Sequence, residues 1–383
     1  MRVLKPRESL SRILVVVPNW VGDVILASPT LAALREHFRH ARITYLLRRY
    51  VSEIVEGCGW HDNLIHWPQQ RGLARETGVL RLAGRLRIER FNLALLLTNS
   101  FRSALTVWLA RIPRRVGYAR EARGWLLTDR LRPLKRDGQF VPSSVLPYYA
   151  RIAEHVGCPV PDRALRLSAT PEQQRLGAEL MRHYGLDGGQ PYAIVNVGAK
   201  FGAAKCWLPE RFAEVCGRLE AECGLLPVLV GAPGEVPLMR DIAQRAEQRV
   251  VCCDEPGTTL GSLKTLVRGA ALLVCNDTGP RHYGIAYNTP TVTIFGPTHQ
   301  EWTDTGFRDE IKLQVPVPCG PCQLPRCPLD LRCMTELTTD MVMRAIAELL
   351  ERRPPATARS AAGDKQPSSG QEQSRASSRP QLR

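Results

Sequence analysis

The chain has 383 residues, of which 44% are hydrophobic, enough to fill two ordinary domain cores, so its composition excludes wholesale disorder. The net charge of +15 is concentrated near the start: residues 1–150 hold 25 Lys and Arg against 11 Asp and Glu, and the rest hold 27 against 26. This asymmetry indicates an anionic partner for the first half (phosphorylated lipid, membrane surface or nucleic acid), or a solvated arginine-rich surface.

The apolar runs are too short for a membrane span or a signal peptide. The run Ile13 to Val17 ends at Pro18, far below the roughly 20 residues that cross a bilayer. Most of the 12 cysteines are scattered along strand-like and helix-like stretches, as a reducing compartment permits. We therefore expect a cytoplasmic protein that at most rests on a membrane face.

The first half alternates short apolar runs with helical patterns. We predict a strand over Arg12 to Val17, a helix from about Val24 to Phe38, and strands over Ala41 to Leu47 and Phe91 to Leu97. This alternation is typical of a parallel sheet covered by helices. Prolines and polar residues interrupt the pattern around Pro161 to Pro171.

The second half repeats the same alternation more clearly. Its predicted helices run from about Pro209 to Leu219 and from Glu235 to Ala246. Its predicted strands are Tyr192 to Val197, Leu225 to Val230, Arg249 to Cys253, Ala271 to Cys275 and Thr291 to Phe295. Two consecutive doubly wound halves imply a cleft between them, with ligands beyond the carboxyl ends of the strands. We expect domains over residues 1–170 and 171–353 and a disordered tail over 354–383.

The first candidate site is the loop that joins the opening strand to its helix, with the sequence PNWVGD over residues 18–23. An aspartate there commonly caps a helix, which is the structural alternative for Asp23. The functional interpretation is that Asp23 faces the cleft and takes a proton from an attacking hydroxyl. Gly22 beside it would let a ligand approach the backbone closely.

The second candidate site is the small-residue loop from Gly198 to Lys205, which follows a predicted strand. Backbone amides, a helix start and the charges of Lys200 and Lys205 would converge there, which suits a phosphate. The spacing is not that of a Walker loop, and a surface loop with two solvated lysines is the alternative.

The third candidate site, from Asn276 to His282, lies between a predicted strand and helix. Thr278 and Gly279 offer a hydroxyl and a close backbone approach to a phosphate. Asp277 could accept hydrogen bonds from sugar hydroxyls, and His282, one turn further on, could reach the same pocket.

Four segments in order resemble glycosyltransferase family 9, especially its heptosyltransferase II-like members: ILVVVPNWVGDVILASPTLAAL, VGAKFGAAKCWLPERFAEV, VLVGAPGE and VCNDTGPRHYGIAYNTPTVTIFGPTHQEWTD. The resemblance covers about residues 12–350. It implies the GT-B fold, two facing Rossmann-like doubly wound domains, with the acceptor on the first and a nucleotide sugar on the second. It further implies inverting transfer of heptose from ADP-heptose to the heptose/Kdo inner core of lipopolysaccharide, without a metal or other cofactor.

The resemblance also implies roles for individual residues. Asp23 matches the proposed catalytic base, and Lys205 matches the lysine that neutralises the diphosphate of the departing ADP. Asn19, Trp20 and Gly22 are then expected on the acceptor side. The expected donor-binding residues are Gly198, Lys200, Glu235, Asp277, Thr278, Gly279 and His282. Thr278 replaces a serine of many members, and Pro280-Arg281 replaces a more apolar pair, which leaves the exact sugar and acceptor open.

The implied partners are the nucleotide-sugar donor, the phosphorylated lipopolysaccharide core and, through peripheral association, the inner membrane. Nucleic acid is not expected, because aromatic residues make up only 6% and no nucleic-acid-binding motif occurs among the basic residues. A family 9 transferase for another nucleotide sugar is the alternative, and a non-enzymatic anion-binding protein is the remote one.

A cysteine cluster near the end has the spacing C-x2-C-x4-C-x5-C, formed by Cys319, Cys322, Cys327 and Cys333. Four thiols so close in sequence could hold a structural Zn²⁺. Reduced or disulfide-capable thiols in a structured loop are the alternative, and the spacing is not that of two separated CxxC pairs.

Overall fold

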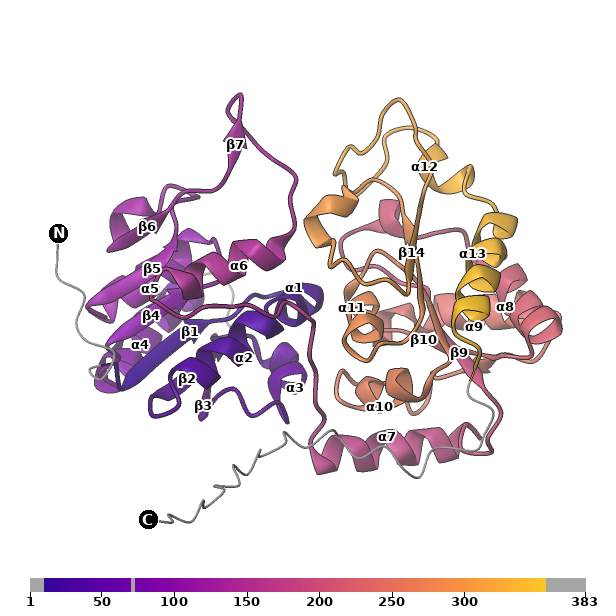
Figure 1. The fold of residues 1–383 in the computed structure, drawn as a ribbon, viewed down its shortest axis with the longest axis horizontal. Helices are drawn as coiled ribbons and strands as arrows, with labels where there is room; N and C mark the ends of the chain where they lie inside the picture. The colour runs from indigo at the N-terminus through magenta and orange to yellow at the C-terminus, as the bar shows by residue number, and fades with distance from the viewer. Residues whose placement is uncertain (1–9, 70–72, 356–383) are drawn as a thin grey trace, which may run out of the picture.

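The computed structural model describes residues 10–69 and 73–355, and it shows two α/β halves side by side (Figure 1). The first half contains a parallel sheet in the order β3-β2-β1-β4-β5-β6. Its strands are β1 (Arg12–Val16), β2 (Arg42–Leu47), β3 (Asn63–His66), β4 (Leu93–Leu96), β5 (Arg114–Tyr118) and β6 (Asp129–Leu131). Its helices are α1 (Val21–Leu26), α2 (Ser28–His37), α3 (Ser52–Val55), α4 (Leu73–Ile88), α5 (Phe101–Leu109) and α6 (Val145–Glu154). A small hairpin, β7 (Lys135–Arg136) with β8 (Gln139–Phe140), follows β6.

The second half has the same order, β11-β10-β9-β12-β13-β14, again with all pairings parallel. Its strands are β9 (Tyr192–Asn196), β10 (Leu226–Val230), β11 (Val251–Cys252), β12 (Leu272–Asn276), β13 (Thr291–Phe295) and β14 (Glu310–Gln314). Its helices are α7 (Pro171–His183), α8 (Pro209–Cys223), α9 (Val236–Arg245), α10 (Ser262–Gly269), α11 (Gly279–Ala286), α12 (Arg332–Thr335) and α13 (Thr339–Arg352).

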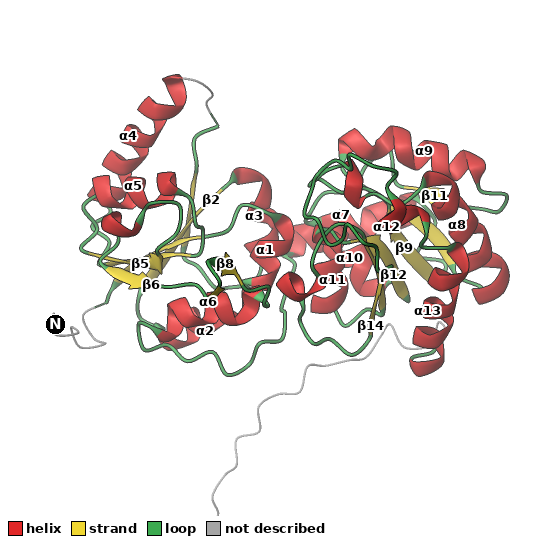
Figure 2. Ribbon diagram, turned by 90° about the horizontal axis from the view of Figure 1, so that it is seen from above, coloured by secondary structure: helices red, strands yellow, loops and turns green. Residues whose placement is uncertain are grey.

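Each sheet is doubly wound, with helices on both faces (Figure 2). The central strands β1, β4, β9 and β12 are buried almost throughout, which explains why they read as continuous apolar runs in the sequence. The strand order reverses between β1 and β4 and again between β9 and β12. Ligands of such sheets bind in the crevice at this reversal, so the residues after β1, β9 and β12 carry the candidate sites.

The predicted helix over 24–38 is wrong in detail, because two helices occupy this stretch. Helix α1 begins at Val21 with Trp20 as its N-cap, and α2 begins at Ser28 with Pro29 in its first turn. Asp23 therefore lies inside the first turn of α1, and the structural alternative, that it caps the helix, does not hold. A carboxylate in this turn still interacts favourably with the positive end of the helix dipole.

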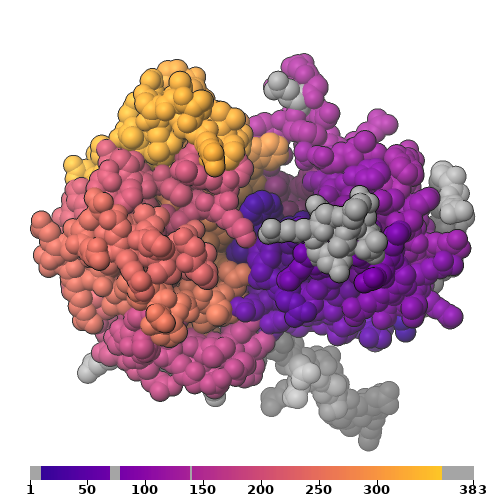
Figure 3. Space-filling model, turned by 180° about the vertical axis from the view of Figure 1, so that it is seen from behind, coloured from indigo at the N-terminus to yellow at the C-terminus, as the bar shows by residue number. Residues whose placement is uncertain are grey.

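The two halves touch at the helices that follow the reversals. Helix α1 packs against α11, and a space-filling view shows the surface hollowed where the halves meet (Figure 3). A second contact joins α3 to α10: the backbone N–H of Gly261 donates to Glu53 Oε2 at 2.6 Å. The buried Lys264 ammonium donates to the carbonyls of Glu56 at 2.9 Å and Ser168 at 2.8 Å.

The largest apolar cluster spans both halves. It contains Ile25 and Leu31 from the first half together with Leu266 and Ile285 from the second. Helix α7 packs against α10, as expected if the second domain begins at residue 171; that boundary stays a prediction. The predicted tail lies outside the described residues from 356 onward, and within the described part no helix is long and apolar enough to cross a membrane.

Candidate active site

Asp23 is the first element of the site and comes from the first half. It is partly buried in the first turn of α1, the helix that follows β1 and packs against α11. Burial raises the pKa of its carboxyl to about 6, Lys205 opposes the rise, and the negative charge of Asp277 adds to it. Asp23 is thus electrostatically coupled to two residues of the other half, and its pKa suits a general base that works near neutral pH.

Lys205 and Asp277 form an ion pair at the carboxyl end of β12, in the second sheet. Lys205 Nζ lies 2.5 Å from Asp277 Oδ2, and the two side chains are only 13% and 8% exposed. The hydroxyl of Thr298 donates to the same carboxylate oxygen at 2.8 Å. Burial alone would raise the pKa of Asp277, but Lys205 and then Arg281 hold it below its ordinary value, so Asp277 is a carboxylate.

Asn276 holds the lysine segment in place. Lys205 ends a short 3-10 turn, Ala203–Lys205, which closes the predicted loop from Gly198 to Lys205. Asn276, fully buried at the end of β12, accepts from the backbone N–H of Trp207 at 3.1 Å and donates to the carbonyl of Val197 at 2.8 Å. One amide side chain therefore ties the lysine segment to both β9 and β12.

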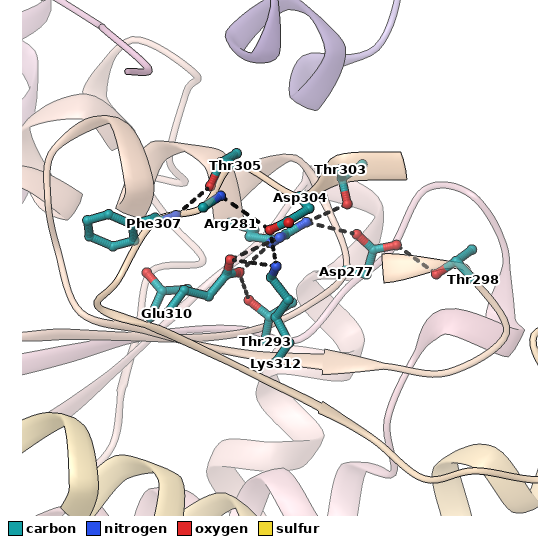
Figure 4. Close-up of polar contacts among 12 residues, drawn as sticks. Asp277, Arg281, Thr293, Thr298, Thr303, Asp304, Thr305, Phe307, Glu310 and Lys312 are labelled. Carbon is teal, nitrogen blue, oxygen red and sulfur yellow. Dashed lines mark hydrogen bonds and ion pairs between the residues drawn. The ribbon is translucent and has the colours of Figure 1, made fainter. Parts of the chain in front are cut away.

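A network of buried charged side chains, centred on Arg281, lies next to Asp277 (Figure 4). Arg281, with no exposed side-chain surface, binds both oxygens of Glu310, Nε to Oε1 at 2.5 Å and Nη2 to Oε2 at 3.0 Å. Its Nη1 donates to Thr303 Oγ1 at 2.6 Å and lies 3.7 Å from Asp277 Oδ1. A bidentate pair of this kind fixes the guanidinium, so Arg281 supports Asp277 from the side opposite Lys205.

His282, which we expect on the donor side, packs against Gly22 of the first half. A Cβ placed on Gly22 would lie 2.8 Å from His282 Cδ2, so the imidazole already occupies the close approach that we predicted for a ligand at Gly22. Burial, and then the charge of Arg281, lower the pKa of His282 to about 3. His282 is therefore neutral and, in the described part of the chain, its buried Nδ1 has no hydrogen-bond partner.

Thr278 and Gly279 lie where the sequence predicted them, at the start of α11. Thr278 is the N-cap in an extended conformation, and its side chain makes no capping hydrogen bond within the described residues. A Cβ on Gly279 would lie 2.7 Å from Val21 Cγ1, so this glycine permits the contact between α11 and α1. The hydroxyl of Thr278 and the amides of the first turn can serve a phosphate.

The remaining donor-side candidates cluster beside the lysine segment. A Cβ on Gly198 would lie 1.9 Å from the Glu235 carboxyl carbon, so Glu235 packs directly on the backbone of Gly198. Glu235 Oε2 also accepts from the backbone N–H of Ala232 at 2.7 Å, which means that part of its carboxylate is used locally. The ammonium of Lys200 lies 4.6 Å from the ring centroid of Tyr50, which belongs to the first half.

On the acceptor side, Trp20 is 51% exposed and Asn19 is partly buried beside it. The hydroxyl of Tyr50 donates to the carbonyl of Asn19. Tyr50 therefore connects the predicted acceptor loop to Lys200 of the donor half.

The sequence analysis missed Tyr50, Thr298 and Glu310, and it placed Asn276 at the start of the third site without giving it a role. Tyr50 could have been found from its place shortly after a strand. The sequence offers no such signal for Thr298 or Glu310. Arg281 was noticed only as a departure from a family pattern.

The cysteine cluster does not form a metal site within the described residues, where no three Cys, His, Asp or Glu side chains are grouped as ligands. Cys319 and Cys322 are exposed, and Cys333 is buried. Burial, with the neighbouring thiols, raises the pKa of Cys333.

A cavity of about 470 Å³ opens beside the lysine segment. Its lining includes Gly296, Gln314 and Pro321, and a Cβ on Gly296 would lie 3.2 Å from the carbonyl oxygen of Ala204. Neither Asp23 nor Lys205 lines this cavity, so the cavity lies beside the charged cluster of Asp23, Lys205 and Asp277.

Known proteins resemble this chain over most of its length. Lipopolysaccharide heptosyltransferase 2 of Escherichia coli K12 is 29% identical over 304 residues, which cover 76% of this chain and 84% of that protein. Lipooligosaccharide heptosyltransferase 2 of Haemophilus influenzae is 28% identical over 302 residues, with coverages of 76% and 85%.

The solved structure of E. coli ADP-heptose lps heptosyltransferase II superposes with a TM-score of 0.72 at 22% identity, covering 89% of this chain and 99% of that one. A family 9 glycosyl transferase from Veillonella parvula gives 0.74 at 21% identity, with coverages of 89% and 97%. The predicted GT-B fold is thereby confirmed. The profile described as Glycosyltransferase family 9 (heptosyltransferase) matches residues 79–331, which is more than half of the chain. The chain is therefore a glycosyltransferase and belongs to glycosyltransferase family 9.

Proposed function

We propose that this enzyme transfers heptose from ADP-heptose to the inner core of lipopolysaccharide, with inversion at the anomeric carbon. The observation that carries the proposal is the placement of Asp23, with its pKa of about 6, next to the Lys205–Asp277 pair of the opposite half. The substrate assignment is supported by the relatives, which are lipopolysaccharide and lipooligosaccharide heptosyltransferases.

In the proposed reaction, the acceptor hydroxyl attacks the anomeric carbon while the bond from that carbon to the ADP oxygen breaks. The hydroxyl proton passes to the Asp23 carboxylate, and the electron pair of the broken bond leaves with ADP. Lys205 and the first-turn amides of α11 stabilise the developing charge on the diphosphate. Positive charge at this position lets transfer proceed without a metal, as the family resemblance implies.

The acceptor is a phosphorylated lipid, and it would meet the first half, which carries nearly all of the net positive charge. We accordingly place the enzyme at the cytoplasmic face of the inner membrane, bound peripherally.

Titration calorimetry tests the donor first, with ADP-heptose, ADP-glucose, UDP-N-acetylglucosamine and GDP-mannose offered separately without added metal. Selective binding of ADP-heptose supports the proposal. Binding of another of these donors would keep the site and replace the sugar, and binding of none would refute ADP-heptose as the donor.

The site assignment is tested with the Asp23→Ala variant in the same calorimeter and in a transfer assay. We expect donor binding to persist while transfer is lost. Loss of donor binding instead would place Asp23 on the nucleotide side and end its role as the base.

A further inference from the structure

Three aromatic side chains of the first half form an exposed cluster, which we call the aromatic patch. It consists of Phe101, Trp108 and Trp125, whose side chains are 40%, 43% and 59% exposed. The ring centroid of Trp125 lies 6.2 Å from that of Phe101 and 6.0 Å from that of Trp108. Single exposed apolar residues are ordinary on protein surfaces, whereas a contiguous aromatic group indicates a binding surface.

Helix α5, which carries two of the three rings, exposes large apolar side chains where a surface helix normally has a polar face. Phe101 and Trp108 are seven residues apart and share one helix face, while Ser103, Ala104 and Val107 are buried on the other. The helix therefore buries small side chains and presents its largest apolar ones to solvent. Its sequence, FRSALTVWL, contains one charged residue and no acid.

The patch rests on a rigid support. Arg123, directly before the 3-10 turn that carries Trp125, is fully buried. It donates from Nε to the carbonyl of Tyr118 at 3.0 Å, and from its other nitrogens to Ser103 Oγ and Asn99 Oδ1, both at 3.3 Å. The guanidinium thus ties the start of α5 to the Trp125 segment. Rings held in this way lose little conformational entropy when they bind a partner.

The charge around the patch identifies the partner. Residues 101–136 contain ten Lys and Arg but only two acidic residues, and five of the ten are exposed: Arg111, Arg130, Arg132, Lys135 and Arg136. Tryptophan favours the interface between lipid headgroups and acyl chains, and clustered basic residues favour anionic headgroups. Aromatic rings among arginines therefore fit an anionic bilayer surface.

The helix that carries Phe101 and Trp108 begins at the same edge of the sheet as the helix of Asp23, although the two pack on opposite faces. Helix α5 follows β4, and α1 with Asp23 follows β1, the strand paired with β4 in parallel. Both helices consequently leave the same edge of the sheet.

We propose that the aromatic patch docks this enzyme on the anionic bilayer that carries its acceptor. The inference rests on the proposed function only in taking the acceptor to be lipid-borne. Docking would set the orientation in which the acceptor sugar reaches Asp23, and it would not change the chemistry of transfer.

Co-sedimentation of the full chain with vesicles tests the docking surface directly. We expect binding to phosphatidylcholine vesicles that contain phosphatidylglycerol, weaker binding at high salt, and little binding to phosphatidylcholine alone. The double variant Trp108→Ser/Trp125→Ser should bind the anionic vesicles roughly tenfold more weakly or worse. The matched control, Leu176→Ser/Leu329→Ser, removes exposed apolar side chains from the second half and should bind like the wild type.

Transfer to a delipidated, water-soluble acceptor tests the proposed transfer function separately from the docking surface. The tryptophan variant should retain this activity and its unfolding midpoint, which excludes misfolding as the cause of weaker vesicle binding. A wild type without activity on this acceptor would count against the proposed function and leave the vesicle result intact. Equal vesicle binding by variant and wild type would overturn the docking surface. So would a wild-type dimer that the variant abolishes, because the patch would then join two copies of the chain.

Discussion

Replacing Asp23 with asparagine should stabilise the protein while it removes activity. The amide has nearly the same shape as the carboxylate and no charge. The folded protein raises the pKa of Asp23 from 3.8 to about 6, so it binds the proton more tightly than the unfolded chain does. Ionised Asp23 therefore costs stability at neutral pH. A shift of about two pKa units corresponds to about 3 kcal/mol.

The sign of this effect predicts a pH dependence. Below pH 4 both states hold the proton, and Asp23→Asn should leave the free energy of unfolding nearly unchanged. Between pH 4 and pH 6 the wild type should lose stability relative to the variant, and above pH 6 the gap should reach its full size of up to about 3 kcal/mol. Denaturant unfolding at a series of pH values measures the gap. Asp187→Asn, at an exposed aspartate in the loop before β9, is the matched control.

The same variant should transfer sugar at least about a hundredfold more slowly, because it cannot accept the proton. Wild-type activity should fall as the pH drops through about 6. A variant that is less stable than the wild type at pH 8 would refute the assignment of a strained, partly desolvated carboxylate. A variant that keeps wild-type kcat would refute its role as the base.

Further outcomes are expected at three other positions. Lys205→Ala should lower kcat/KM about a hundredfold and weaken ADP binding, measured by kinetics and calorimetry, and unchanged values would remove Lys205 from the site. Gly22→Ala should lower the free energy of unfolding through its clash with His282, and less so in a His282→Ala background; equal losses in both would deny the contact. Lys264 has its pKa lowered to about 8 by burial, so wild-type stability should rise between pH 8 and pH 10.5, where the folded protein has lost the ammonium proton and the unfolded chain still holds it. A Lys264→Met variant should show a flatter profile over that range, and an unchanged slope would mean that Lys264 does not cause it.

The fold was largely predictable because the central strands are buried on both faces. Runs such as Tyr192 to Val197 and Thr291 to Phe295 read as strands without any structural knowledge, and they appear as β9 and β13. Outer strands of both sheets were missed (β3, β5, β6 and β14), since they carry polar residues, as in the RRVGY of β5 and the DRL of β6, whereas the edge strand β11 was predicted. Polar edge positions depend on pairing with distant segments, which local patterns do not record.

The site was predictable in its members more than in its contacts. Asp23, Lys205 and Asp277 stand next to strand ends in the sequence, so their gathering at the cleft followed from topology. The direct pairing of Lys205 with Asp277, and the support of Arg281 by Glu310, join residues 72 and 29 positions apart. Sequence spacing carries no information on such pairs, and for the same reason it did not show that His282 packs against Gly22 of the other half.

The apolar cluster that runs through both halves has a thermodynamic consequence. Because Ile25 and Leu31 share one core with Leu266 and Ile285, neither half can lose its packing without exposing apolar surface of the other. The halves should then melt together, in a single calorimetric transition whose enthalpy matches the van't Hoff value. A chimera with one half taken from a distant relative would inherit half of this shared core, and its stability would depend on whether the donated face fits the remaining one.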